Sequence, residues 1–171
     1  SLIVNGKPVG IDAGETVTVT MPGGETISLK LERNPEVTFK GNGFSFRHSS
    51  DYQVSNSAPA DDVAQHVIVS GLGTLVLVQA YKGTDPTTLT EFMLNRITQD
   101  DVAAGGKLES APHQRVVANG MTLAGLKGVI TSSDESATVE VMAAKTQFGG
   151  IIAVSRIDSD NEEADRALVE K

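Results

Sequence analysis

Residues 123–157 read LAGLKGVITSSDESATVEVMAAKTQFGGIIAVSRI, and this stretch decides the fold. It contains three runs rich in Val, Ile, Leu and Ala, at 123–130, 138–145 and 151–157. The turn-forming segments 132–135 and 148–150 separate these runs. Short apolar runs with turn residues between them indicate β-strands, and short connections leave neighbouring strands antiparallel. The sequence therefore predicts a meander of antiparallel strands, whose first strand lies near 115–117 and turns at Asn119-Gly120.

The first 34 residues predict a smaller β-structure. Apolar residues alternate with threonine at 16–21, and the alternation resumes at 26–31 after the Pro-Gly-Gly segment 22–24. A period of two on both sides of a turn predicts a hairpin with one apolar face. A second hairpin is predicted around the Asn-Gly pair at 5–6. Because an isolated hairpin is marginally stable in water, we expect this N-terminal β-hairpin extension, 1–34, to dock on the rest of the chain or on a partner.

Residues 35–171 are predicted as the main domain. Before the meander, the pattern predicts short strands at 37–39, 44–46, 66–69 and 75–78. The last of these runs is continuously apolar, which is typical of a central strand covered on both faces. The polar stretch 55–62 contains Pro59 and several small residues, so it predicts a loop.

One helix is predicted between the strands and the meander. Either Asp85, with Pro86 at the first helical position, or a capping box of Thr88 and Glu91 begins it. Apolar residues then follow at helical spacing as far as the Gly-Gly pair at 105–106, which is a stop signal.

A closing helix is predicted from Ser159 or Asp160 to the last residue, with acidic side chains in its first turn, where the helix dipole favours them. Asp158, Asp160 and Glu162 also place carboxylates at alternate positions and are candidates for a weak divalent-cation site. The segment lacks the glycine and the bidentate glutamate of a calcium-binding loop.

Composition excludes several classes of function. The chain has 171 residues, a formal net charge of −8 and no cysteine. An acidic balance argues against a nucleic-acid-binding protein, which needs a basic face. The absence of cysteine excludes disulfides and thiolate metal sites. No apolar run approaches the ~18–20 residues that a membrane-spanning helix requires.

A family resemblance begins at residues 43–54, GFSFRHSSDYQV. A glycine and an alternating apolar strand lead there to Asp51 and Tyr52, and another strand follows. This segment resembles the opening of the PsbP-like family, which has a proline, any residue, an aspartate and a tryptophan at that point. Ser49 or Ser50 stands in place of the proline, and Tyr52 stands in place of the tryptophan.

The helix at 89–104 and the meander at 120–157 with its closing helix are similar to the same family, so the resemblance covers about residues 36–171. The family includes an extrinsic photosystem II subunit, a Ran-binding nuclear import factor and bacterial envelope proteins of the DcrB type. It implies an α+β fold with a twisted, mainly antiparallel sheet flanked by helices, an α/β/α sandwich. It also implies a mostly non-catalytic role in binding proteins and sometimes metal ions.

The sequence contains no set of residues arranged for catalysis. His48-Ser49-Ser50-Asp51 contains the residue types of a hydrolase triad, but adjacent positions on one strand and loop cannot converge as a triad requires. His66 and His113 are distant from His48 and from each other, without partners at metal-ligand spacing. No glycine-rich phosphate loop is present. We therefore expect no catalytic or cofactor-binding residues.

The leading hypothesis is a non-enzymatic protein-interaction or accessory protein of the bacterial cell envelope, of inhibitor or immunity type. A periplasmic or outer-envelope location is expected for an acidic, Thr/Ser/Gly-rich sheet protein without cysteine. One alternative is a carrier of a small molecule or divalent metal, which needs a pocket between sheet and helix. A second is a hydrolase that gathers His66 or His113 with a distant serine and aspartate.

Overall fold

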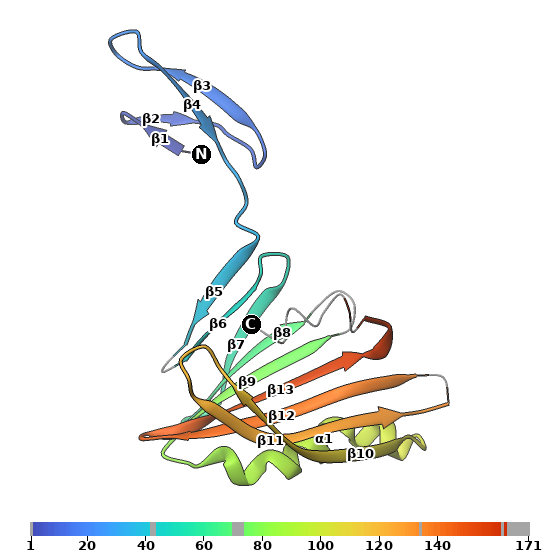
Figure 1. The fold of residues 1–171 in the computed structure, drawn as a ribbon. Helices are drawn as coiled ribbons and strands as arrows, with labels where there is room; N and C mark the ends of the chain where they lie inside the picture. Colours follow the sequence, from blue (N-terminus) through green and yellow to red (C-terminus); the bar gives the residue numbers. More distant parts are fainter. Residues whose placement is uncertain (1, 42–43, 70–73, 134, 162, 164–171) are drawn as a thin grey trace. The chain divides into compact units, whose positions relative to one another are not determined.

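The computed structural model describes residues 2–41, 44–69, 74–133, 135–161 and 163. The chain divides into two units: an N-terminal unit of residues 1–37 and 49–51, and a main unit of residues 38–48 and 52–171. The described residues are mostly antiparallel β-sheet with one short α-helix (Figure 1). The predicted α+β character with a mainly antiparallel sheet is thus confirmed.

The N-terminal unit consists of two hairpins. Strands β1 (Leu2–Val4) and β2 (Lys7–Val9) form one, and β3 (Thr16–Thr20) and β4 (Thr26–Lys30) form the other. Asn5 and Gly6 join the first pair with φ angles of 49° and 75°. A type I′ turn requires positive φ at both central residues, which is why the Asn-Gly pair predicts it correctly. Both hairpins expected from the sequence are confirmed.

Strands β5 (Glu36–Lys40) and β6 (Ser45–Ser49) form a further two-stranded sheet. Three phenylalanines lie together on it: the ring centroids of Phe39 and Phe46 are 5.1 Å apart, and that of Phe44 lies 6.2 Å from Phe46. A Cβ at Gly41 would stand 2.7 Å from the Phe44 ring, so this ring would have to shift to admit a larger residue there.

The main unit contains a seven-stranded sheet in the order β10-β11-β12-β13-β9-β8-β7. Its strands are β7 (Gln53–Ala60), β8 (Val63–Val69), β9 (Leu75–Lys82), β10 (Lys107–Val116), β11 (Thr122–Thr131), β12 (Ser136–Thr146) and β13 (Gly149–Asp158). Every neighbouring pair is antiparallel, which confirms the predicted meander and the strands at 66–69 and 75–78.

The predicted loop at 55–62 is wrong, because most of it belongs to β7. Backbone hydrogen bonds to β8 hold this strand, with Ser55 opposite Val67 and Ser57 opposite Gln65. An edge strand needs no apolar side chains for such bonds, and it tolerates Pro59 beside the register shift between Ser57 and Ala60. The polar composition of residues 55–62 therefore led to the wrong prediction, because it does not reveal a strand that is held by its neighbour.

Asp85 caps a 3-10 turn that precedes the predicted helix, and neither of the two predicted caps begins the α-helix itself. The carboxylate of Asp85 accepts a hydrogen bond of 3.1 Å from the backbone N–H of Thr87. A 3-10 turn, η1 (Pro86–Leu89), leads into α1 (Thr90–Ala103), whose N-cap residue Leu89 makes no side-chain cap. Gly105, with φ of 97°, follows the end of the helix as predicted.

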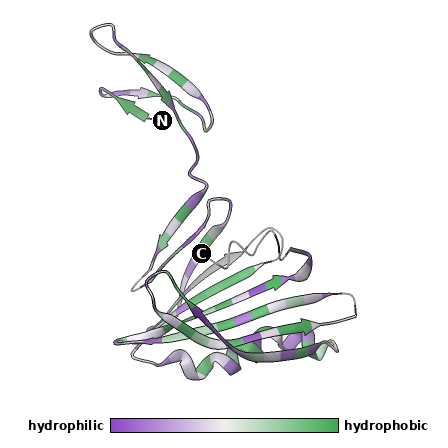
Figure 2. Cartoon of the chain, in the orientation of Figure 1, coloured by the Kyte–Doolittle hydropathy of each residue, from purple (hydrophilic) through white to green (hydrophobic). Residues whose placement is uncertain are grey.

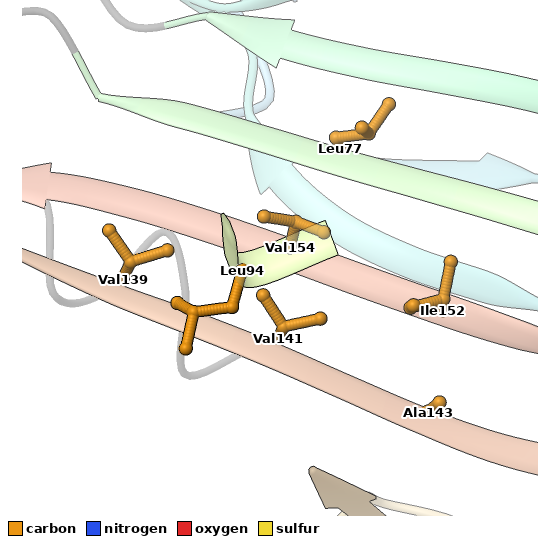
Figure 3. Packing of buried hydrophobic residues seen from close by; sticks show 7 residues of the cluster. All are labelled: Leu77, Leu94, Val139, Val141, Ala143, Ile152 and Val154. Carbon is orange, nitrogen blue, oxygen red and sulfur yellow. The ribbon is translucent and has the colours of Figure 1, made fainter. Parts of the chain in front are cut away.

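The core lies between α1 and one face of the sheet, the helix face. Leu94 of α1 is 2% exposed and stands over β12 and β13 (Figure 3). Its cluster contains Leu77, Val139, Val141, Ala143, Ile152 and Val154. Gly128 on β11 makes room for the helix, since a Cβ there would lie 3.0 Å from Leu108 and 3.3 Å from Leu94.

The opposite face of the sheet carries a smaller apolar cluster. Met142 and Ala144 belong to it, because alternate residues of β12 point away from α1. Val117 and Met121, at the tip of the β10–β11 hairpin, pack against this cluster. The tip is closed by a backbone hydrogen bond of 2.9 Å from Val117 N to Met121 O.

The structure shows the sheet with helix α1 on one face, and the predicted closing helix lies mostly outside the described residues. Residues 159–161 form a short 3-10 turn, η2 (Ser159–Asn161). The described part therefore establishes one helical layer of the expected sandwich.

Candidate functional site

Three basic side chains surround Glu140 on β12 in the described part of the sheet. Val139 and Val141 on either side of it in the sequence are buried against α1, so Glu140 points to the opposite face. The register places Lys127 of β11 directly across from it. Arg115 and His113 of β10 complete the group, which we name the Glu140 cluster.

The three basic side chains contact both carboxylate oxygens. Arg115 donates from Nη2 to Oε2 over 2.7 Å. Lys127 Nζ lies 3.2 Å from Oε1, and His113 Nε2 lies 3.9 Å from the same oxygen. The Glu140 side chain is only 10% exposed, whereas that of Lys127 is 44% exposed. The carboxylate is thus at the base of the cluster, and the cations are at its rim.

Ion pairs offset the burial of the carboxylate in the Glu140 cluster. Arg115 and Lys127 both pair with the carboxylate of Glu140. Burying a carboxylate is costly unless it is paired and hydrogen-bonded. Arg115 and Lys127 meet that need for Glu140, whose side chain is 10% exposed.

A second ionic group ties the end of α1 to β13. Arg156 donates to both oxygens of Asp101, from Nη1 over 2.5 Å and from Nη2 over 3.1 Å. The hydrogen bond from Arg156 lowers the pKa of Asp101, and the same bond raises the pKa of Arg156. A bidentate pair of this kind favours one orientation of the helix end, so its role is structural.

Two of the three candidate metal ligands lie in the described part, and they do not form a metal site there. Asp158 Oδ1 lies 3.5 Å from Arg156 Nε, so a cation already faces this carboxylate. Asp160 is exposed on η2, and Glu162 lies outside the described residues. In the described ranges, no three His, Asp or Glu side chains converge as a metal ion would require.

The triad-like residue types at 48–51 occupy local structural positions. His48 is buried, and its ring lies 6.1 Å from that of Phe46. Ser49 Oγ lies 3.4 Å from the Asp51 carboxylate, which itself pairs with Arg33 over 2.9 Å. His113 belongs to the Glu140 cluster, and the side chain of His66 lies outside the described part of the structure.

The N-terminal unit presents apolar surface. Between residues 2 and 37, every described residue is exposed or half-buried. The large apolar side chains most exposed there are Leu2, Ile3, Leu31 and Val37, with Ile3 71% exposed. Figure 2 shows hydrophobic stretches on the strands of the N-terminal unit. A side-chain contact of 3.6 Å, from the amide of Asn5 to the sulfur of Met21, connects the two hairpins.

Comparison with known proteins adds no family: no family model matches the chain, and no curated protein matches it. The described helices are too short or too polar to cross a lipid bilayer.

The sequence search missed the Glu140 cluster. The available signal was a charged residue inside the apolar run Val139-Glu140-Val141-Met142, a position where a carboxylate needs partners. Its partners could not be named, because Arg115 is 25 positions away in the sequence.

Proposed function

We propose that the chain is a non-catalytic module that binds another protein, with the N-terminal unit as the binding surface. The observation that carries this proposal is the absence of any buried side chain among residues 2–37, together with the exposure of Ile3 and Leu31. Two-stranded hairpins without a core are marginally stable in water. Exposed apolar surface of this kind is typical of sites that bind proteins.

We also propose the family and the cellular location that the sequence analysis suggested. The main unit would be a PsbP-like domain with helices on both faces of its sheet, and the protein an accessory or inhibitory protein of the bacterial cell envelope. The antiparallel meander preceded by a single amphipathic helix supports this assignment. Fractionation of cells that produce the full-length protein tests the location: recovery in the cytosolic fraction would contradict it.

The two alternatives have less support in the described residues. A carrier needs a cavity, and the hollow between Asp101, Ile130 and Arg156 has a volume of about 30 Å³, which suits one water molecule. A wider hollow of about 420 Å³ beside Phe148 is open to solvent. A hydrolase needs a histidine beside a nucleophile, and Nε2 of His113 instead lies 3.9 Å from the Glu140 carboxylate.

The proposal is tested with a double variant of the full chain, Ile3→Lys with Leu31→Lys. A matched control is Val116→Lys, because Val116 on β10 is 69% exposed and Ile3 is 71% exposed. Cross-linking in cell-envelope extracts should yield the same partner with the wild type and the control. We expect the double variant to bind that partner at least about tenfold more weakly.

Equal binding by the double variant would show that the N-terminal unit is not the binding surface. Failure of the wild type to cross-link reproducibly to any partner would contradict the protein-binding function itself.

A further inference from the structure

Two asparagine-glycine pairs of the described chain lie in turns that differ in how firmly they are held. Asn5-Gly6 joins β1 to β2, and Asn119-Gly120 lies at the tip of the β10–β11 hairpin. Both asparagines are exposed. An asparagine before glycine loses its side-chain amide readily in water, because no Cβ on the glycine hinders attack by its backbone nitrogen. The local structure therefore decides which of the two pairs reacts.

The turn at Asn119 is held by several hydrogen bonds. The backbone N–H of Gly120 donates to the carbonyl of Val117 over 2.8 Å. The backbone N–H of Met121 donates to Oδ1 of Asn119 over 2.9 Å, which fixes the side chain. Val117 and Met121 also pack against the apolar cluster on the face opposite α1. The nitrogen of Gly120 and the side chain of Asn119 are thus both engaged, and a reaction between them requires the hairpin tip to open.

The turn at Asn5 is held by much less. Strands β1 and β2 pair over three residues each, and neither contains a buried side chain. Among the described residues, no group accepts a hydrogen bond from the N–H of Gly6. The side-chain amide of Asn5 lies 3.6 Å from the sulfur of Met21, which is a weak acceptor. A hairpin of this size opens readily, because its backbone hydrogen bonds are few and no core holds it.

We propose that Asn5 is a site of spontaneous deamidation, and that the hairpin around Asn119 protects that residue from the same reaction. When the β1–β2 hairpin opens, the backbone nitrogen of Gly6 attacks Cγ of Asn5. A bond forms between these two atoms and the bond from Cγ to Nδ2 breaks. The side-chain nitrogen leaves as ammonia, taking up the proton that Gly6 loses.

The product of this first step is a five-membered succinimide, which water then opens at either of its two ring carbonyls. One ring-opening yields aspartate and the other yields isoaspartate. The overall balance is one water consumed and one ammonia released, without any oxidant or reductant. Each reaction adds one negative charge at position 5.

The reaction changes the N-terminal unit in two ways. A carboxylate replaces the donor Nδ2, so the side-chain contact with Met21, which connects the two hairpins, is lost. The isoaspartate product also adds a methylene group to the main chain inside the turn, which then no longer fits a two-residue type I′ connection. These changes occur two positions from Ile3, which is 71% exposed. The modification site does not depend on the protein-binding role proposed above.

The test is incubation of the folded full chain in buffer at physiological temperature, with samples taken over several weeks and analysed by peptide mapping and mass spectrometry. The same chain in concentrated urea is the matched control, because unfolding removes the structural difference between the two turns. In the folded chain, we expect Asn5 to deamidate at least about tenfold faster than Asn119, since a short hairpin without a core opens more often than a hairpin of the main sheet. In urea, we expect the two asparagines to react at similar rates.

A pair of variants tests the consequence for the N-terminal unit. Asn5→Asp reproduces the aspartate product, and Asn119→Asp is the matched control at the other turn. The methyl signal of Met21 in NMR spectra should shift in Asn5→Asp and stay in place in Asn119→Asp, because Asn5 contacts that side chain and Asn119 belongs to the main unit. An unmoved Met21 signal in Asn5→Asp would contradict the loss of contact between the hairpins.

The proposal is overturned if Asn119 deamidates as fast as Asn5 in the folded chain. It is also overturned if Asn5 stays intact in the folded chain over the weeks in which it reacts fully in urea. A ratio of rates in urea equal to that in the folded chain would have the same effect, because the flanking residues rather than the structure would then set the rates.

Discussion

Replacement of Leu94 by alanine should destabilise the main unit more than any other single truncation on α1. Leu94 is the large apolar residue of the helix that the sheet buries, at 2% exposure, and it packs against Val139, Val141 and Val154 (Figure 3). Truncation of a buried leucine to alanine removes transfer free energy and leaves a cavity, which together cost about 3 kcal/mol. For a domain of this size, that loss lowers the thermal midpoint by about 6–12 °C.

The matched control is Phe92→Ala on the same helix. Phenylalanine is the larger side chain, but Phe92 is 64% exposed, so we expect a change within about 0.5 kcal/mol. Urea unfolding of both variants, followed by circular dichroism, measures the free energy of unfolding and its dependence on denaturant. The reasoning is refuted if Phe92→Ala costs as much as Leu94→Ala, or if Leu94→Ala costs less than about 1 kcal/mol.

Two further predictions concern β11 and the ion pair at the end of α1. Gly125→Ala should prevent the native pairing of β11 with β12, because a Cβ at Gly125 would lie within 1.9 Å of the backbone oxygen of Val141; a variant with native thermal stability would contradict this. The pKa of Asp101 is lowered by Arg156, so the carboxylate stabilises the native state above its ordinary pKa of 3.8 and this contribution is lost as the pH falls through the lowered native value. Asp101→Asn should therefore unfold at a lower thermal midpoint than the wild type at pH 7, and the difference should shrink at pH 2.5; a constant difference would show that the ion pair is not its cause.

Several local features could be predicted from the sequence because their causes lie within a few residues. The Asn5-Gly6 turn follows from the ability of these residues to adopt positive φ. The 3-10 turn that leads into the helix follows from Asp85, whose carboxylate accepts from Thr87 two positions later. The alternation at 16–21 likewise indicates a strand without reference to the rest of the chain.

Other features depended on contacts that no local pattern contains. Strand β7 is held by its pairing with β8, so Ser55 and Ser57 form a strand despite a composition typical of loops. The room that Gly128 leaves for Leu94 depends on where α1 crosses the sheet.

The sequence by itself determined the hairpins, the helix and the mainly antiparallel meander, since turn conformation, capping and alternation act over short distances. Only the tertiary structure decided that Glu140 would be buried beneath Arg115 and Lys127. That arrangement requires the registers of β10 with β11 and of β11 with β12, and a shift of one residue in either would turn one of these side chains to the helix face.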